Sequence, residues 1–424
     1  MTYVVDPKIK SWIEVPPNSD FPIQNIPFGV IKLKNGKIRC ATRIGNYGID
    51  LYALAKRGYF KDLEFSAKVF KKPDLNDFIS LGKNVHRAVR QRIVDLFKQD
   101  SQQIRDDAEI KSKILYHITD VEPQMPVTVG DYTDFYSSKE HATNVGIMFR
   151  DPENALFPNW KHLPVGYHGR SSSIVVSGTN IHRPMGQTKG DQDEVPSFGP
   201  SRLFDFELES AFVIGKSTQL GDSVSIEEAE EYIFGMVLFN DLSARDIQKW
   251  EYVPLGPFLG KNFGSVISPW IVTLDALEPF RTASPEQNPE VLPYLKYNGN
   301  KSFDINLEVY IKPEGGDENL ICRSNFKYLY WNMAQQLAHH TVNGCNIKVG
   351  DMMASGTISG PDATAFGSML ELSWKGTKPL KLSDGSERKF LQDMDTVVMR
   401  GYATKEDMRI GFGDCITQVL PVKK

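Results

Sequence analysis

An alternating segment at residues 201–211 carries three closely spaced carboxylates. Its apolar positions are Phe204, Phe206 and Leu208, and its carboxylates are Asp205, Glu207 and Glu209. Strict alternation is the period of a β-strand with two different faces, so the carboxylates share one face. Neighbours on that face stand about 7 Å apart, and like charges this close disfavour ionisation unless water screens them or a cation lies between them. The segment therefore predicts either a solvated strand face or a cation site.

A second group of residues, nearer the N-terminus, could supply a general base. Asp134 and Tyr136 precede a predicted helix. Ser137 and Glu140 have the spacing of a capping box, which puts His141 in the first helical turn. A histidine there could accept a proton, and a hydrogen-bonded structural histidine is also compatible with the pattern.

A carboxylate that could orient this histidine lies far along the chain. Glu371 falls in a stretch predicted to be strand-like. There it either faces water or acts as the acid of a histidine–carboxylate pair. Thr357 precedes it in a loop of small residues, 355–360.

Polar side chains also follow the buried strand predicted at 233–239. Asp241 comes where that strand ends and a helix begins, either as an N-cap or as a ligand. Arg245 and Gln248 are three residues apart, so they share a helical face. That face is either solvated or presents donors to an oxyanion. Lys261 lies in a following loop rich in Pro and Gly and could hold an anionic group, although the spacing is not that of a P-loop.

The composition excludes several classes of protein. A net charge of −4 and a pI of about 6.1 give no support for nucleic-acid binding. The four cysteines form no Cys-x-x-Cys pair, which argues against a thiolate zinc site and a disulfide framework. No apolar run is long enough to span a membrane and no signal core opens the chain, so we expect a cytosolic protein without a membrane partner. Asp and Glu without His or Cys at ligand spacing favour a hard cation, Ca²⁺ or Mg²⁺.

The elements that must position these residues can be outlined from periodicity. A length of 424 residues predicts two domains. Apolar runs at 28–34 and 38–41 flank an Asn-Gly pair, which predicts a hairpin within a small N-terminal β-barrel. Apolar residues recur every four positions over 85–97, which predicts an amphipathic helix. Residues 121–126 contain two prolines and are predicted to be a linker, and a longer helix is predicted from 325 onward.

Five long segments carry a family resemblance. They are Asp131–Ser138, His141–Arg150, Leu163–Arg170, Trp250–Lys261 and Ser355–Gly360. Through these segments the chain resembles the fumarylacetoacetate hydrolase family over nearly its whole length. The resemblance implies a mainly β fold with some α, in which residues 1–125 form an SH3-like β-barrel domain and residues 126–424 a mixed β-roll catalytic domain. It also implies a homodimer formed through the C-terminal domain.

The resemblance further implies a role for each candidate site residue. The calcium ligands are Asp134, Glu207, Glu209 and Asp241, and the magnesium site is Asp241, Lys261 and Ser265. The general base is His141, paired with Glu371, and the oxyanion donors are Arg245, Gln248 and Lys261. The substrate contacts are Tyr136, Arg150, Tyr167, Gln248, Tyr252 and Thr357. Two positions depart from the family pattern, Leu242 where Trp is usual and Ser265 where Thr is usual, and neither removes a catalytic group.

The activity implied by the resemblance is metal-dependent hydrolysis of the carbon–carbon bond of 4-fumarylacetoacetate to fumarate and acetoacetate, the last step of tyrosine degradation. Two alternatives stay open at this point. Another metal-enolate enzyme of the same fold, an oxo-acid decarboxylase or tautomerase, would need the carboxylates but not the pair of His141 and Glu371. A calcium-binding structural protein would need neither that pair nor Lys261.

Overall fold

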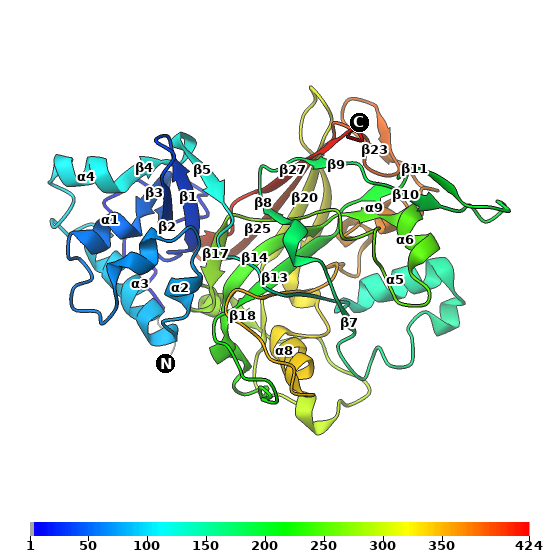
Figure 1. Ribbon diagram of the computed structural model, residues 1–424, viewed down its shortest axis with the longest axis horizontal. Helices are drawn as coiled ribbons and strands as arrows, with labels where there is room; N and C mark the ends of the chain where they lie inside the picture. The colour runs from blue at the N-terminus through cyan, green and yellow to red at the C-terminus, as the bar shows by residue number, and fades with distance from the viewer. Residues whose placement is uncertain (1–3, 424) are drawn as a thin grey trace.

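The N-terminal strands form one end of a large sheet. The computed structural model describes residues 4–423, and its principal sheet has 13 strands. β1 (Phe28–Leu33) and β2 (Ile38–Ile44) form the predicted hairpin, which β3 (Tyr47–Asp50) and β4 (Leu115–His117) extend. β1 also pairs with β17 (Trp270–Thr273), so the N-terminal strands continue into the sheet of the C-terminal part (Figure 1). Within residues 4–423 these strands close no barrel, so the expected SH3-like barrel is not confirmed.

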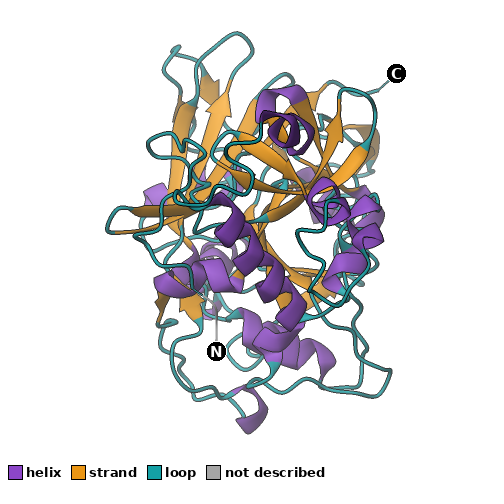
Figure 2. Cartoon of the chain, turned by 90° about the vertical axis from the view of Figure 1, so that its left-hand side faces the viewer, coloured by secondary structure: helices purple, strands orange, loops and turns teal. Residues whose placement is uncertain are grey.

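Helices cover the N-terminal strands. They are α1 (Leu51–Lys56), α2 (Asn76–Ile79), α3 (Lys83–Phe97) and α4 (Ala108–Ile114). α3 confirms the predicted amphipathic helix, because Val89, Ile93 and Phe97 are fully buried in the N-terminal core. Figure 2, which looks at the molecule from this side, shows helices lying in front of strands.

The predicted linker at 121–126 is wrong for its first residues. β5 (Val121–Gln124) is a strand that pairs with β1, and Pro123 lies opposite Ile31. Proline cannot donate a ladder hydrogen bond, but an edge strand tolerates it because its N–H side need not be paired. Pro123 therefore lies in an edge strand, and Pro126 follows that strand.

The C-terminal part contains a second sheet packed against the first. The remaining strands of the principal sheet are β6 (Tyr132–Phe135), β7 (Gly166–His168), β8 (Ile174–Val176), β13 (Leu208–Ile214), β14 (Ile233–Asp241), β16 (Ser265–Ile267) and β22 (Met352–Ala354). The six-stranded sheet comprises β9 (Ile181–His182), β20 (Asn306–Lys312), β21 (Asn319–Asn325), β25 (Thr396–Lys405), β26 (Met408–Gly411) and β27 (Cys415–Leu420). Met236 and Leu238 of β14 share one core with Leu307 and Val309 of β20, which joins the two sheets face to face. The predicted class, mainly β with some α, is confirmed.

Shorter elements connect these sheets. The two-stranded pairs are β10 (Met185–Thr188) with β11 (Ser197–Pro200), β12 (Phe204–Asp205) with β15 (Ser243–Ala244), β18 (Arg281–Thr282) with β19 (Ser302–Phe303), and β23 (Leu380–Lys381) with β24 (Glu387–Arg388). The helices are α5 (Lys139–Phe149), α6 (Arg245–Glu251), α7 (Leu274–Leu277), α8 (Met333–Thr341) and α9 (Met369–Leu372). Within the described chain, no helix is long and apolar enough to cross a membrane.

Two predicted elements differ from the structure. The alternating segment 201–211 is divided between β12 and β13, and both its apolar and its acidic side chains are buried, so it has no solvated face. Sequence alternation could not show that other elements cover the acidic face as well. The helix predicted from 325 begins only at α8, where Asn332 and Gln335 form a capping box. The predicted buried strand at 233–239 is confirmed as β14.

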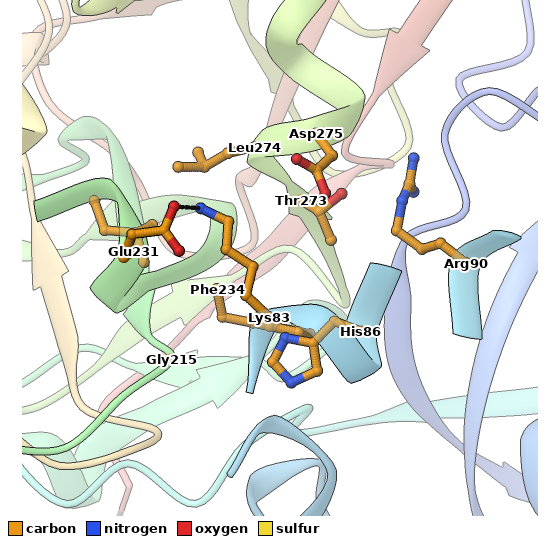
Figure 3. A pocket seen from close by; sticks show the side chains of 10 residues that line it. Lys83, His86, Arg90, Gly215, Glu231, Phe234, Thr273, Leu274 and Asp275 are labelled. Carbon is orange, nitrogen blue, oxygen red and sulfur yellow. Dashed lines mark hydrogen bonds and ion pairs between the residues drawn. The ribbon is translucent and has the colours of Figure 1, made fainter. Parts of the chain in front are cut away.

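A polar seam joins α3 to the C-terminal part (Figure 3). Lys83 pairs with Glu231 at 3.0 Å. The guanidinium of Arg87 donates two hydrogen bonds to Asp275, at 2.9 and 3.0 Å. His86 is buried beside these pairs and faces Phe234 edge-on. The seam ties α3 to the turn before β14, through Glu231, and to α7, through Asp275.

Candidate active site and metal centre

Four carboxylates from separate strands converge in the C-terminal part. Asp134 lies in β6, Glu207 directly precedes β13, Glu209 lies in β13, and Asp241 ends β14. The backbone N–H of Asp241 donates to the carbonyl of Glu207, which places those two residues side by side. One oxygen of each carboxylate lies within 4.8 Å of one oxygen of every other, and all four residues are buried. The four residues predicted as one ligand set are therefore brought together.

Burial and neighbouring charges shift the pKa values of the four carboxylates in this cluster. Burial, followed by the charge of Asp241, raises the pKa of Asp134 well above its usual range. Burial and the charge of Asp134 do the same to the pKa of Glu209. Burial also raises the pKa of Asp241, against the opposing charge of Lys261. Burial would raise the pKa of Glu207 too, but neighbouring cations, Lys261 foremost, outweigh it and lower that pKa.

Two buried cations compensate only part of this negative charge. The Lys261 ammonium donates to Glu207 and, at 2.6 Å, to Oδ2 of Asp241. The Arg245 guanidinium pairs with Glu207 through Nη1 at 2.7 Å and donates from Nε to Oδ2 of Asp205 at 2.8 Å. Asp205 thus adds a fifth buried carboxylate to a site with two cations. If all five carboxylates were ionised, the two cations would leave this region with excess negative charge, and the raised pKa values of Asp134, Glu209 and Asp241 reflect this excess.

The donor set fits a hard cation. Every candidate ligand atom is a carboxylate oxygen, which is the donor that Ca²⁺ and Mg²⁺ prefer. Oδ1 of Asp134 and Oε1 of Glu209 are buried, and neither has a hydrogen-bond partner among residues 4–423. Native proteins rarely leave such atoms unpaired, and an ion is one reason for the exceptions. These residues therefore could hold a divalent cation.

The two remaining predicted magnesium ligands lie beside Asp241. The Ser265 hydroxyl donates to Oδ1 of Asp241 at 2.8 Å. Burial acts to lower the pKa of Lys261, but the negative charges of Asp241 and Glu207 outweigh burial and raise this pKa above its usual range. An ammonium has no lone pair. A metal contact of Lys261 would therefore have to use its backbone carbonyl.

His141 and Glu371 form a buried pair. Nδ1 of His141 lies 2.7 Å from Oε2 of Glu371, although the residues are 230 positions apart. His141 lies in the first turn of α5, as predicted, but the N-cap is Ser138 instead of Ser137. The hydroxyl of Ser138 accepts from the backbone N–H of His141 at 3.2 Å. The predicted first-turn histidine is thus confirmed with its cap shifted by one residue.

Glu371 lies in the short helix α9, so the predicted strand-like stretch is wrong at this position. Its carboxylate accepts hydrogen bonds from Asn144 at 2.9 Å, Ser359 at 2.9 Å and Ser368 at 2.8 Å, besides His141. Burial acts to raise the pKa of Glu371, but the His141 charge and these hydrogen bonds hold it below its usual value. An ionised Glu371 accepts the proton on Nδ1, which leaves Nε2 of His141 as the acceptor.

Arg245 and Gln248 share a face of α6, as their spacing predicts. Nη1 of Arg245 donates to Oε1 of Gln248 at 3.3 Å. Nη2 of Arg245 is buried, and within residues 4–423 it has no hydrogen-bond partner. The Thr357 hydroxyl is likewise buried and unpaired. Donors left free in a buried polar site are available to a ligand.

Comparison with known proteins adds a second line of support. Residues 131–420 match the family described as fumarylacetoacetate (FAA) hydrolase C-terminal, and residues 24–126 match fumarylacetoacetase N-terminal. The chain belongs to the fumarylacetoacetate hydrolase family. It is 54% identical to fumarylacetoacetase of Dictyostelium discoideum over 98% of this chain and 99% of that protein. It is 53% identical to fumarylacetoacetase of Homo sapiens over 97% and 99%. The structure of a fumarylacetoacetate hydrolase from Exiguobacterium antarcticum, at 18% identity, covers 93% of this chain and 99% of its own with a TM-score of 0.51 and shares the fold.

The residues that the family resemblance assigns to substrate are placed unequally. Tyr136 packs edge-on against the ring of His141, with centroids 5.3 Å apart. The Tyr167 hydroxyl lies 3.4 Å from Oδ2 of Asp241, at the carboxylate cluster. Tyr136 therefore lies beside the proposed base and Tyr167 beside the carboxylate cluster, and their contact with substrate stays a prediction.

Arg150 and Tyr252 have no contact with the cluster in the part of the chain that the structure describes. The Arg150 guanidinium donates to the carbonyl of Ala155 at 2.6 Å and lies over the ring of Phe157, 4.1 Å from its centroid. The Tyr252 side chain is 53% exposed on the loop after α6. Their assignment to substrate binding in this family member remains a prediction.

Sequence reasoning missed the residues that support Glu371. Ser359 donates to both oxygens of Glu371, Ser368 caps α9, and Asn144 follows His141 by one helical turn. The loop of small residues at 355–360 was the available signal, because a hydroxyl in such a loop can approach a buried group closely. Nothing in the sequence pointed to Ser368 or Asn144.

Proposed function

We propose that this protein hydrolyses 4-fumarylacetoacetate to fumarate and acetoacetate, the last step of tyrosine degradation. The observation that carries the proposal is the buried pair of His141 and Glu371. The pair lies close enough to the carboxylate cluster for a protonated His141 to lower the pKa of Glu207. Water activation needs such a pair, and a site that only binds calcium does not. Full-length relatives named fumarylacetoacetase, more than half identical, support the same substrate.

A divalent cation completes the proposed site. Asp134, Glu207, Glu209 and Asp241 would hold it, with Ser265 beside Asp241, and Ca²⁺ or Mg²⁺ suits these oxygen donors. When bound, the cation acts as a Lewis acid that lowers the energy of enolate charge on the diketone oxygens.

The residues of the chain then account for the hydrolysis. Nε2 of His141 takes a proton from water while Glu371 holds Nδ1 and stabilises the imidazolium. The hydroxide adds to the carbonyl next to the fumaryl group. The carbonyl electrons move to oxygen, where Arg245, Gln248 and Lys261 receive the oxyanion. Collapse of the adduct breaks the carbon–carbon bond. The electron pair of that bond leaves with the acetoacetate part, which takes up the proton held on Nε2 of His141, and the base is thereby restored.

Substrate orientation is assigned to a further set of residues. Tyr136, Tyr167, Gln248 and Thr357 would contact the bound diketone from the walls of the site. Arg150 and Tyr252 would steer its charged ends. Arg150 would have to turn away from Ala155 and Phe157 to do so, because its guanidinium is engaged there.

The wider organisation belongs to the same proposal. We infer an N-terminal SH3-like domain over 1–125, a β-roll catalytic domain over 126–424, a homodimer through the latter and a cytosolic location. Val253, Leu255 and Phe258, which are 67%, 96% and 66% exposed, support an interface on the C-terminal domain, because such apolar side chains gain free energy when covered.

The test is an assay with fumarylacetoacetate itself. Loss of the diketone absorbance, with formation of fumarate and acetoacetate in equal amounts, is the expected result, and a chelator should abolish it until Ca²⁺ or Mg²⁺ is returned. An enzyme that leaves this substrate intact but decarboxylates or tautomerises an oxo-acid would establish the alternative. A protein that binds the cation and turns over neither substrate would be a binding protein.

A further inference from the structure

Asp205 is a buried carboxylate that contacts the proposed site and that the proposed mechanism does not use. It belongs to the alternating segment with Glu207 and Glu209, but it is not part of the group of four whose oxygens converge. It is fully buried. Burial raises its pKa, while Arg245 and a backbone hydrogen bond from Leu370 act in the opposite direction. A fully buried acid of this kind needs an explanation by its contacts.

The contacts of Asp205 join two parts of the proposed site. Its Oδ1 accepts from the backbone N–H of Met369 at 2.7 Å, and its Oδ2 accepts from that of Leu370 at 3.0 Å. These are the first two residues of α9, the helix that carries Glu371. Oδ2 also accepts from Nε of Arg245 at 2.8 Å. The carboxylate of Asp205 therefore connects α9, which carries Glu371, to the guanidinium of Arg245.

The backbone strengthens this connection. Glu207 forms a β-bridge with Ser368, and the N–H of Leu208 donates to the carbonyl of Gly367 at 2.8 Å. The start of α9 is thus held by the same short segment that supplies two ligands of the cluster. Arg245 uses Nε to bind Asp205 and Nη1 to bind Glu207. Its third nitrogen, Nη2, has no hydrogen-bond partner among residues 4–423.

We propose that Asp205 is a positioning residue that fixes the register of α9, and hence Glu371, relative to Arg245. This inference rests on the proposed function for its meaning in catalysis. Asp205 is not among the converging cation ligands, and it acts by placing Glu371 relative to Arg245. Misplacing a catalytic group by about 1 Å can lower the rate about 100-fold. Mutation of a residue that supports a catalytic group typically lowers activity by about 10- to 100-fold.

The test is Asp205→Asn in the full-length, Mg²⁺-loaded enzyme. An amide keeps one acceptor and places an NH₂ group against a donor, so it cannot satisfy Met369, Leu370 and Arg245 together. We expect kcat to fall by about 10- to 100-fold, while KM and Mg²⁺ affinity by calorimetry stay near the wild-type values. We also expect the low-field proton resonance of Nδ1 of His141 to shift or broaden, because its partner Glu371 moves.

A matched control separates positioning from stability. Asp395 is also a buried aspartate that accepts from an arginine, Arg388 at 2.8 and 2.9 Å, and from the backbone N–H of Gln392 at 2.8 Å. Asp395→Asn should lower thermal stability, yet leave kcat and the His141 resonance unchanged. Equal kcat values in the two variants would overturn the proposal.

A double variant tests the route. If Asp205 acts through Glu371, then Asp205→Asn combined with Glu371→Gln should be little slower than Glu371→Gln alone, and multiplicative losses would overturn the proposal. Should Asp205→Asn not fold, Asp205→Ser replaces it, because Arg245 keeps Glu207 as a counter-charge. If neither folds while Asp395→Asn does, Asp205 is a folding residue and the proposal is wrong. A wild type that ignores fumarylacetoacetate would refute the proposed function, whereas the His141 resonance would still report on Asp205.

Discussion

Replacement of Glu371 by Gln gives the most informative test of the histidine–carboxylate pair. Glu371 accepts from four side chains, His141, Asn144, Ser359 and Ser368, and a glutamine has one oxygen and one NH₂ with which to face them. If the NH₂ faces His141, Nδ1 must become an acceptor, and Nε2 then carries the proton and cannot act as a base. If the oxygen faces His141, the tautomer survives and only the counter-charge is lost.

The expected loss can be worked out for the milder of these two orientations. His141 and Glu371 are both buried, so the charge pair formed when His141 takes a proton is poorly screened. Two charges about 4 Å apart at an effective dielectric constant of about 20 interact by about 4 kcal/mol, which is about three powers of ten in rate. This agrees with the range of about 10² to 10⁴ typical of general-base catalysis. We therefore expect Glu371→Gln to lose about 10³ in kcat.

The assay is turnover at saturating fumarylacetoacetate and fixed Mg²⁺ for the wild type, His141→Ala, Glu371→Gln and the double variant. Calorimetry should show unchanged Mg²⁺ affinity in Glu371→Gln, because Glu371 is not in the ligand cluster. Glu140→Gln, one residue before His141, is the control and should keep full turnover. The double variant should be little slower than His141→Ala. Strictly multiplicative losses would show that the two residues act separately and would refute the pair.

Three further predictions follow from the cluster, the seam and the exposed loop. Glu209→Gln should weaken Ca²⁺ and Mg²⁺ binding in calorimetry without lowering the melting temperature of the apoprotein, because it relieves repulsion between carboxylates. Glu207→Gln should lower both the cation affinity and the melting temperature, because it leaves Lys261 and Arg245 with one partner fewer. Unchanged binding in both variants would contradict the cation site. Burial lowers the pKa of His86 from 6.5 to about 4, so the unfolded chain takes up the proton first. The free energy of unfolding therefore includes a contribution from neutral His86 that is fully present above pH 6.5 and falls by about 3 kcal/mol as the pH drops towards 4. His86→Gln should flatten the plot of unfolding free energy against pH in this range. An unchanged slope would contradict the role given to His86. Sedimentation at micromolar concentration should give a dimer, and Leu255→Asp should shift it towards monomer; a wild-type monomer would remove the proposed interface.

Much of the local structure could be predicted from the sequence, because it depends on interactions between near neighbours in the chain. The Asn-Gly pair between apolar runs gave the hairpin of β1 and β2, and apolar residues every fourth position gave α3. The continuous apolar run at 233–239 gave β14, with Asp241 at its end. Long segments shared with a known family pointed to the ligand set and to the pair of His141 and Glu371 before any contact between them was visible.

The remainder depended on which elements meet, and this the local pattern does not contain. The acidic face of 201–211 is buried because Lys261, Arg245 and the start of α9 pack on it, so alternation alone could not distinguish a solvated strand from a cation site. β1 continues into β17, and pairings across more than 200 residues decide whether a sheet closes.

Glu371 shows the division most clearly. Its type and the family resemblance suggested a partner for His141, but its neighbours in sequence suggested a strand. The structure places it in α9, because Asp205 accepts the N–H groups at the start of that helix and Ser368 caps it. The sequence determined which side chains are available for the chemistry, and long-range hydrogen bonds between buried groups determined where they stand, because an unpaired buried polar group costs more than a local conformational preference gains.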